Sequence, residues 1–208
     1  MKRIVDKINE LSGQYHSHDI FQDWVTMTAI MISNNFNYDQ ELENVYLSIA
    51  KRYTSEKLIE LSKLTGILVE LMEDDIKDYL GSIYMALNAS SNRTGQFFTP
   101  FHLCEMMAET SLEGYQGNII KLNEPSCGGG ANILALAKAL LKRGFNYQDK
   151  MNVVAQDLDV KCVYMTYTQL SIAGINAEVI QGDTLRNECN RKLLTPMYIL
   201  KGGFSYEG

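Results

Sequence analysis

Apolar residues in the first half of the chain recur at the three- and four-residue spacing of an amphipathic helix. Helices are therefore predicted over residues 20–32 and 40–52, from Thr54 or Ser55 onward, and over 76–87. The helix that follows Thr54 carries a leucine stripe, made up of Leu58, Leu61, Leu64, Leu68 and Leu71. That stripe lasts too few heptads for a coiled coil, so it indicates packing within a helical bundle.

The pattern changes after residues 88–95, which are small, polar and end in glycine, as is typical of a loop. We place the domain boundary there, with an N-terminal helical region over 1–90 and an α/β domain over 91–208. A helix over 101–112 is followed by alternating apolar runs of strand and helix length. The predicted series is strand 118–123, helix 131–143, strand 151–156, helix 160–173 and strand 177–181. Such alternation predicts a parallel sheet with helices packed on its faces.

Composition is ordinary for a globular protein, with 46% hydrophobic and 21% charged residues. No apolar stretch approaches the ~20 residues that a bilayer crossing needs, and the N-terminus lacks the pattern of a secretory signal. We therefore expect a cytoplasmic protein without membrane contact. The net charge of −6 argues against binding of nucleic acid by electrostatics alone. DNA stays open as a substrate through a local basic cluster or a partner subunit.

The cysteines and histidines predict no metal site. The four cysteines form no C-x-x-C pair, so reduced thiols are expected rather than a zinc site or a disulfide framework. His16 and His18 lie beside a predicted helix start, where an isolated H-x-H is most often exposed polar sequence.

A glycine-rich turn is the first feature with specific chemistry. The run Asn123-Glu124-Pro125-Ser126-Cys127-Gly128-Gly129-Gly130-Ala131-Asn132 joins a predicted strand to a predicted helix. An acidic residue at a strand end, a glycine turn and a helix N-terminus together are typical of α/β proteins that bind a nucleotide-like ligand. It is not the dinucleotide fingerprint G-x-G-x-x-G, because the three glycines are consecutive.

Two further acidic residues follow the next strands. Asp157 ends the second strand, where a carboxylate can accept both hydroxyls of a ribose, and Leu158 beside it can pack on an adenine face. Asp183 ends the third strand and can accept a hydrogen bond from an adenine amine. Alone, either aspartate would be more typical of a helix N-cap. Their order and spacing on one sheet edge favour a ligand site.

These motifs resemble a known family. The turn resembles motif I of the adenine-N6 DNA methyltransferases, in the form (D/E)-P-x-C-G-x-G. The residues Asp78-Tyr79-Leu80-Gly81-Ser82-Ile83-Tyr84, with Gly95-Gln96-Phe97-Phe98-Thr99-Pro100, resemble D-x-L-G-x-x-Y and G-Q-[FY]-[FY]-T-P of the modification (M) subunits of type I restriction systems. The run from Gln169 to Leu185 resembles the segment that leads into motif III. The resemblance covers about residues 76–186.

The resemblance implies a partial class I, Rossmann-like methyltransferase sheet preceded by a helical region, with S-adenosylmethionine as cofactor. In that family the T-P run is motif X, so Thr99 and Pro100 are expected to contact the methionine carboxylate of the donor. The complete set of cofactor-binding residues implied in this way is Thr99, Pro100, Glu124, Pro125, Cys127, Gly128, Gly130, Asp157, Leu158 and Asp183.

One motif of the family is absent from the sequence. Motif IV, (N/D/S)-P-P-(Y/F), holds the exocyclic amine of the flipped base and stacks on its ring. The three prolines, Pro100, Pro125 and Pro196, are nowhere adjacent. The segment 197–204 is expected to form a fourth strand and turn, with Lys-Gly-Gly-Phe in place of the tetrad. No catalytic residue is assigned for this reason.

Two functional hypotheses remain open. The first is a donor-binding, adenine-specific DNA methyltransferase-like protein that is inactive alone and reaches DNA through a partner, such as a specificity or other restriction-modification subunit. The second is a non-catalytic protein that regulates or joins a host restriction-modification complex; a decayed donor pocket is a third, weaker alternative. Whether the chain is an enzyme, and whether it forms homo- or hetero-oligomers, stays open.

Overall fold

The computed structural model describes residues 1–13, 15–89 and 97–204. The helices are α1 (Lys2–Ser12), α2 (Ser17–Phe36), α3 (Gln40–Ala50), α4 (Ser55–Asp74), α5 (Tyr79–Ala89), α6 (Phe101–Ser111), α7 (Ala131–Lys142), α8 (Tyr147–Lys150), α9 (Val160–Ile172) and α10 (Pro196–Leu200). The strands are β1 (Ile120–Glu124), β2 (Met151–Asp157), β3 (Asn176–Gln181) and β4 (Arg191–Leu194). None of the helices in these ranges is long and apolar enough to cross a membrane.

The predicted alternation of strands and helices is confirmed. Helices precede a sheet whose strand order is β1-β2-β3-β4, with β1, β2 and β3 parallel. Helix α1 is an addition to the predicted elements, and its Ile4 and Ile8 are fully buried. Residues 88 and 89 of the predicted loop are the last two of helix α5, and its residues 90–95 lie outside the described ranges, so the division at residue 90 stays a prediction.

The C-terminal part differs from the prediction. Residues 191–194 form β4, which pairs antiparallel with β3, and residues 196–200 form helix α10 rather than a strand. Thr195 caps this helix by accepting a hydrogen bond from the Tyr198 amide, and Pro196 occupies its first turn, where no amide is needed. Lys201 then donates to the Gln148 carbonyl, just before β2 begins. The segment after α10 therefore lies at the opposite end of the sheet from the glycine turn.

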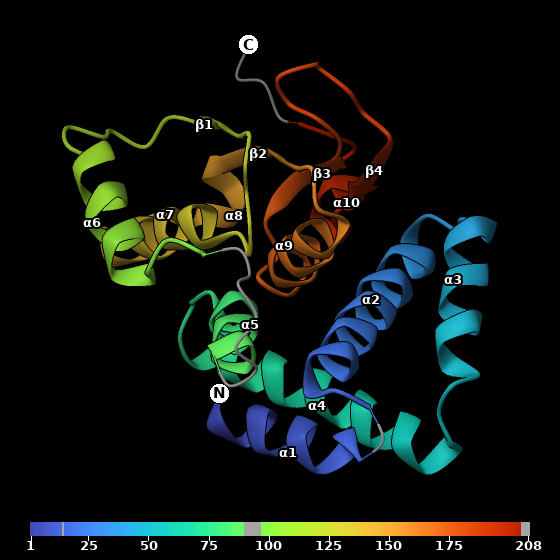
Figure 1. Ribbon diagram of the computed structural model, residues 1–208. Coiled ribbons are helices and arrows are strands. Elements are labelled where there is room, and N and C mark those ends of the chain that lie inside the picture. The colour runs from blue at the N-terminus through green and yellow to red at the C-terminus, as the bar shows by residue number, and fades with distance from the viewer. Residues whose placement is uncertain (14, 90–96, 205–208) are drawn as a thin grey trace.

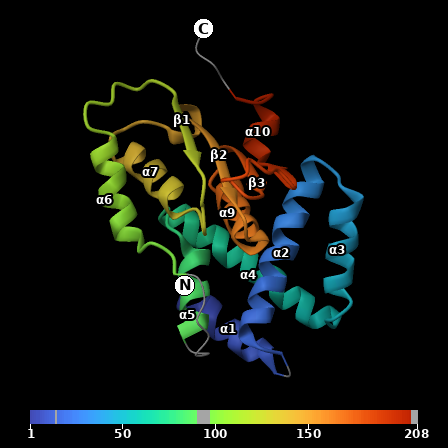
Figure 2. The ribbon, with the colours of Figure 1, turned by 45° about the horizontal axis from the view of Figure 1, so that its top comes forward.

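Both crossover helices cover the same face of the sheet. Because β1, β2 and β3 are neighbours in chain order, right-handed crossovers place α7 and α9 on one side. Figures 1 and 2 show α9 lying between the sheet and α2. The strand residues that point to this covered side are apolar and mostly buried: Ile120, Leu122, Met151, Val153, Ala155, Ala177 and Val179.

The opposite side of the strands carries alternating polar residues. We call this side the outer face of the sheet; in β1, β2 and β3 it is formed by Lys121, Asn123, Asn152, Val154, Gln156, Asn176, Glu178 and Ile180. Lys121 and Asn123 are exposed, Asn152 and Asn176 are buried, and the other four are half-buried. In a parallel sheet that is covered by helices on both sides, the sequence of each strand is a nearly continuous run of apolar residues. The predicted parallel strands are confirmed, and on this side they carry polar as well as apolar residues.

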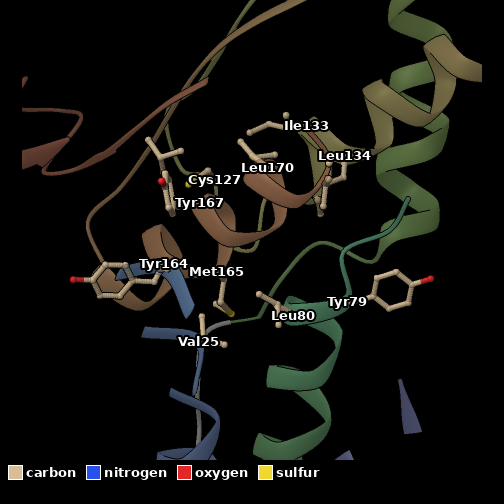
Figure 3. Close-up of a cluster of buried hydrophobic side chains, with 14 of the residues drawn as sticks. Val25, Tyr79, Leu80, Cys127, Ile133, Leu134, Tyr164, Met165, Tyr167 and Leu170 are labelled. Atoms are coloured by element: carbon tan, nitrogen blue, oxygen red, sulfur yellow. The ribbon is translucent and has the colours of Figure 1, made fainter. Parts of the chain in front are cut away.

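One hydrophobic core joins the N-terminal helices to the sheet layer. Figure 3 shows Val25 of α2 and Leu80 of α5 beside Met165 of α9, and Leu170 of α9 beside Ile133 and Leu134 of α7. Leu80 and Leu170 have no exposed surface. The leucine stripe of α4 also turns inward, with Leu61, Leu64 and Leu68 buried, which confirms bundle packing.

We expect two glycine substitutions to change stability in opposite directions. A Cβ atom at Gly182 would lie 2.1 Å from the Glu188 carbonyl oxygen, so Gly182→Ala should lower the free energy of unfolding by about 2–3 kcal/mol through overpacking against the backbone. Gly66, in the exposed part of α4, has nothing within 4 Å of an added Cβ. Gly66→Ala should therefore stabilise the protein by about 0.5–1 kcal/mol. Thermal unfolding of both variants measures the difference, and equal midpoints would contradict it.

Candidate functional site

The glycine turn (residues 125–130) links the end of β1 to the start of α7. Gly128 and Gly130 have φ angles of 54° and 90°, in the left-handed region that side chains other than glycine rarely adopt. The Gly130 amide donates to the Cys127 carbonyl at 2.7 Å, which closes the turn, and Gly130 is the N-cap of α7. The first amides of this helix therefore lie beside the turn, where they favour a negatively charged group.

Each glycine of the triplet allows a different protein element to approach. A Cβ atom on Gly128 would lie 3.1 Å from the Phe98 ring, one on Gly129 would lie 2.7 Å from the Asp78 carboxylate, and one on Gly130 would lie 3.3 Å from the Thr166 hydroxyl. The sequence indicated that the glycine turn belongs to a ligand site. The structure shows that protein side chains fill the space beside all three glycines, so the triplet also packs the turn against its neighbours.

Asp157 joins the end of β2 to this turn. Its carboxylate accepts hydrogen bonds from the Gly128 and Asp159 amides, each at 2.9 Å, and its carbonyl accepts one from the Gly182 amide. The residue is buried, at 8% exposure. A carboxylate has about four lone-pair sites, so acceptor capacity remains for further donors.

A cavity of about 230 Å³ opens between the turn, the end of β2 and the segment before α6. Among the described residues, its lining includes four of the predicted cofactor-binding residues, which are Thr99, Cys127, Gly128 and Asp157. Phe97 and Phe98 also line it. The structure thus brings together the predicted contributions of motif X, motif I and the second strand.

The other predicted residues lie outside this lining. Pro100 is the N-cap of α6, Gly130 caps α7, and the Pro125 carbonyl accepts a hydrogen bond from Thr184. Leu158 is 65% exposed. Asp183 bonds within its own loop, because its carboxylate accepts from the Leu185 and Arg186 amides and lies 3.6 Å from the Arg186 Nε atom.

Glu124 is held by a residue that the sequence did not single out. The Asn132 side-chain amide donates to the Glu124 carboxylate at 3.0 Å. This bond fixes the amide orientation, since only the nitrogen can donate to a carboxylate. The Asn132 oxygen is buried and has no hydrogen-bond partner among the described residues.

Cys127 contributes bulk rather than reactivity. Burial raises the pKa of the Cys127 thiol to about 12, and the carboxylates of Asp157 and Glu124 act in the same direction. The thiol therefore stays protonated near neutral pH, and thiolate chemistry is disfavoured there.

Three further side chains hold the turn, although no role was assigned to them from the sequence: Phe98, Asp78 and Gln169. Phe98 packs on Tyr84 with a ring-centroid distance of 5.2 Å and covers Gly128. The aromatic pair before Thr99 and the aspartate of the D-x-L-G run were signals for two of them. Gln169 is the first residue of the run that resembles the segment leading into motif III, although the resemblance assigned it no role.

Comparison with known proteins gives one family match. The model of the family described as N-6 DNA Methylase matches residues 75–199. A search of the curated proteins found no match.

Solved structures give matches of low sequence identity. A putative class I S-adenosylmethionine-dependent methyltransferase from Listeria monocytogenes has 12% identity and a TM-score of 0.45, over 83% of this chain and 55% of its own. The type I restriction-modification system methyltransferase subunit from Streptococcus thermophilus has 18% identity and a TM-score of 0.44, over 89% of this chain and 39% of its own. The chain thus spans about half the length of these structures, or less.

The expected fold class is confirmed, as a helical region followed by a partial Rossmann-like sheet with parallel strands. The family model covers well over half of the sequence, including the glycine turn and all the strands. The chain belongs to the N-6 DNA methylase family.

Proposed function

We propose that this chain binds S-adenosylmethionine at the glycine turn and represents the donor-binding part of an adenine-N6 DNA methyltransferase of restriction-modification type. It does not methylate DNA alone. The observation that carries the proposal is the contact between Asp157 and the Gly128 amide, which puts an acceptor-rich carboxylate beside the cavity and the start of α7.

The chain's own groups fit a ligand of this kind. Asp157 has lone pairs left for two ribose hydroxyls. Thr99 and the first amides of α7 suit the methionine carboxylate. The Asn132 oxygen, buried without a partner among the described residues, suits an amino group next to Glu124. When bound, the donor supplies an activated methyl group.

Glu124 and Gly130 belong to the proposed site through the shape of the turn, which positions α7. Pro125 and Cys127 shape the same turn. Leu158 is proposed to pack on the adenine face, and Asp183 to accept a hydrogen bond from the adenine amine. The two amides of its own loop both bond to its Oδ1 atom, so its carboxylate keeps acceptor capacity.

Methyl transfer needs a second constellation, and this chain lacks it. The exocyclic amine of adenine must be oriented by acceptors and its ring by stacking. The sequence has no adjacent prolines to form the tetrad. The Lys-Gly-Gly-Phe segment lies near Gln148, away from the cavity, so it does not substitute for the tetrad. We infer that DNA and the target-base groups come from a partner subunit.

Edge strand β1 of the sheet favours the alternative of a non-catalytic binding or regulatory protein. Lys121 lies on edge strand β1, and charged residues on an edge strand oppose pairing with a further strand. If no partner completes the sheet there, the donor site serves binding rather than transfer.

Calorimetry with S-adenosylmethionine and transfer of radiolabelled methyl to adenine-containing DNA test the proposal together. We expect the isolated chain to bind the donor with measurable heat and to transfer no label above background. Transfer by the isolated chain would disprove the inactivity, and absence of binding would disprove the donor site. Addition of a modification subunit that carries the N-P-P-[FY] segment distinguishes completion by a partner from the non-catalytic alternative.

A further inference from the structure

Two buried polar side chains far apart in the sequence meet at the glycine turn. Gln169 of α9 donates through Nε2 to the Asp78 carboxylate at 2.9 Å and to the Gly129 carbonyl at 2.7 Å. Its Oε1 atom accepts a hydrogen bond from the Leu80 amide at 3.0 Å. Gln169 has no exposed surface, yet both ends of its amide are used. It thereby links α9, the start of α5 and the glycine turn.

Asp78 is enclosed by two glycines. Its Oδ1 atom accepts a hydrogen bond from the Gly81 amide at 2.8 Å, at the start of α5. A Cβ atom would lie 2.1 Å from this carboxylate at Gly81 and 2.7 Å from it at Gly129. Burial raises the pKa of Asp78, whereas the hydrogen bonds from Gln169 and Gly81 lower it.

The buried pair of the Asp78 carboxyl and the Gln169 amide is not explained by stability alone. Burying a carboxyl and an amide costs free energy that apolar side chains of similar volume would not cost. Polar groups instead determine geometry, because a hydrogen bond fixes the orientation of the two groups that it joins. Here the group fixed is the Gly129 carbonyl, in the middle of the turn.

We propose that Asp78 and Gln169 are positioning residues that hold the glycine turn in its ligand-binding shape by anchoring the Gly129 carbonyl to the start of α5. The inference deepens the proposed function, since donor binding is the property that the shape would serve. The N-terminal helices are then part of the donor site, although none of the residues described in α1–α5 lines its cavity.

Hydrogen exchange of the ligand-free protein tests the anchoring without any donor. Gln169→Met keeps the length of the side chain and removes its hydrogen bonds, and Asp78→Ala removes the carboxylate. In both variants we expect the Gly130 and Leu80 amides to exchange about tenfold faster or more, because local opening becomes easier. Asp78→Asn keeps an acceptor for Gln169 and Gly81, so exchange should return to within about twofold of the parent.

The matched control is Asn176→Ala. Asn176 is equally buried and donates to Asn152 at 3.0 Å, at the start of β2 and β3, the end away from the turn. It should lower the unfolding temperature without changing exchange at Gly130. The inference is overturned if Gln169→Met leaves exchange at Gly130 as slow as Asn176→Ala does.

Calorimetry adds the functional arm. If the parent binds S-adenosylmethionine, Gln169→Met should weaken binding by about tenfold while Asp78→Asn and Asn176→Ala bind as the parent does. Equal affinity of Gln169→Met and the parent would overturn the positioning role. If the parent does not bind the donor, the proposed function fails, and the exchange result still decides whether the pair anchors the turn.

Discussion

Replacing Asp157 by alanine is expected to weaken S-adenosylmethionine binding by about 10²- to 10⁴-fold, since two hydrogen bonds to a charged acceptor are lost at about 1.5–3 kcal/mol each. The same change removes the acceptor for the Gly128 amide, so the turn loses its link to β2 as well. Isothermal titration calorimetry of the parent and the variant measures the effect. Unchanged affinity in Asp157→Ala would remove Asp157 from the site.

Two variants separate this role from general damage. Asp157→Asn keeps the shape and a single oxygen acceptor, so an intermediate loss of affinity is expected. Asp159 lies two residues further along and caps α9 by accepting a hydrogen bond from the Lys161 amide. Asp159→Ala should cost about 1 kcal/mol of stability through the lost cap and leave donor affinity unchanged.

Replacing Trp24 by alanine is expected to lower the free energy of unfolding by about 4 kcal/mol, since truncation of a buried tryptophan costs about 3–5 kcal/mol. Trp24 is 2% exposed, packs edge-on against Phe21 and donates from its indole nitrogen to the Thr65 hydroxyl at 3.0 Å, which joins α2 to α4. For a chain of this length, the loss corresponds to a fall of about 8–16 °C in the unfolding temperature.

The number of thermal unfolding transitions of the Trp24→Ala variant tests a second point. Since α2 packs on α9 through one continuous core, the helices and the sheet should still unfold in a single transition, detected by circular dichroism and by calorimetry. Two separated transitions would show that the helical region and the sheet are independent units. Leu185→Ala, at a side chain that is 98% exposed, is the control and should change stability by less than about 0.5 kcal/mol.

The fold was predictable wherever the hydrophobic period was long and clear. Helices α2, α4, α7 and α9 and the three parallel strands follow directly from spacing, with ends that differ from the prediction by a few residues. Helix α1 was not predicted, although Ile4 and Ile8 lie four residues apart and are both buried. Two apolar positions in a short, charged segment are a weak periodic signal, and packing against the other helices supplies the rest.

The C-terminal error has a specific physical origin. Thr99-Pro100 predicts a helix start, and α6 does begin there. Thr195-Pro196 carries the same signal, yet the apolar run from Met197 to Leu200 favoured a strand. A hydroxyl cap with proline in the first turn outweighs the β-propensity of a short apolar run, because propensity alone is a weak guide.

The site was predictable in its backbone and less so in its contacts. The order of motifs placed Thr99, Gly128 and Asp157 at one edge of the sheet, and these three line the cavity. That Asp183 bonds to the amides of its own loop depends on the conformation of residues 183–190, which no periodicity encodes. The contact between Asp78 and Gln169 joins residues 91 positions apart and follows only from the packing of α5 against α9.

The outer face of the sheet offers a criterion for sorting genes of this family. A relative with apolar residues at the positions of Lys121, Asn123 and Gln156 would need a second layer of helices to cover them. A relative with polar residues there can dispense with that layer. These three positions, compared across newly sequenced genomes, should therefore separate sheets that are open on this side from those that are covered.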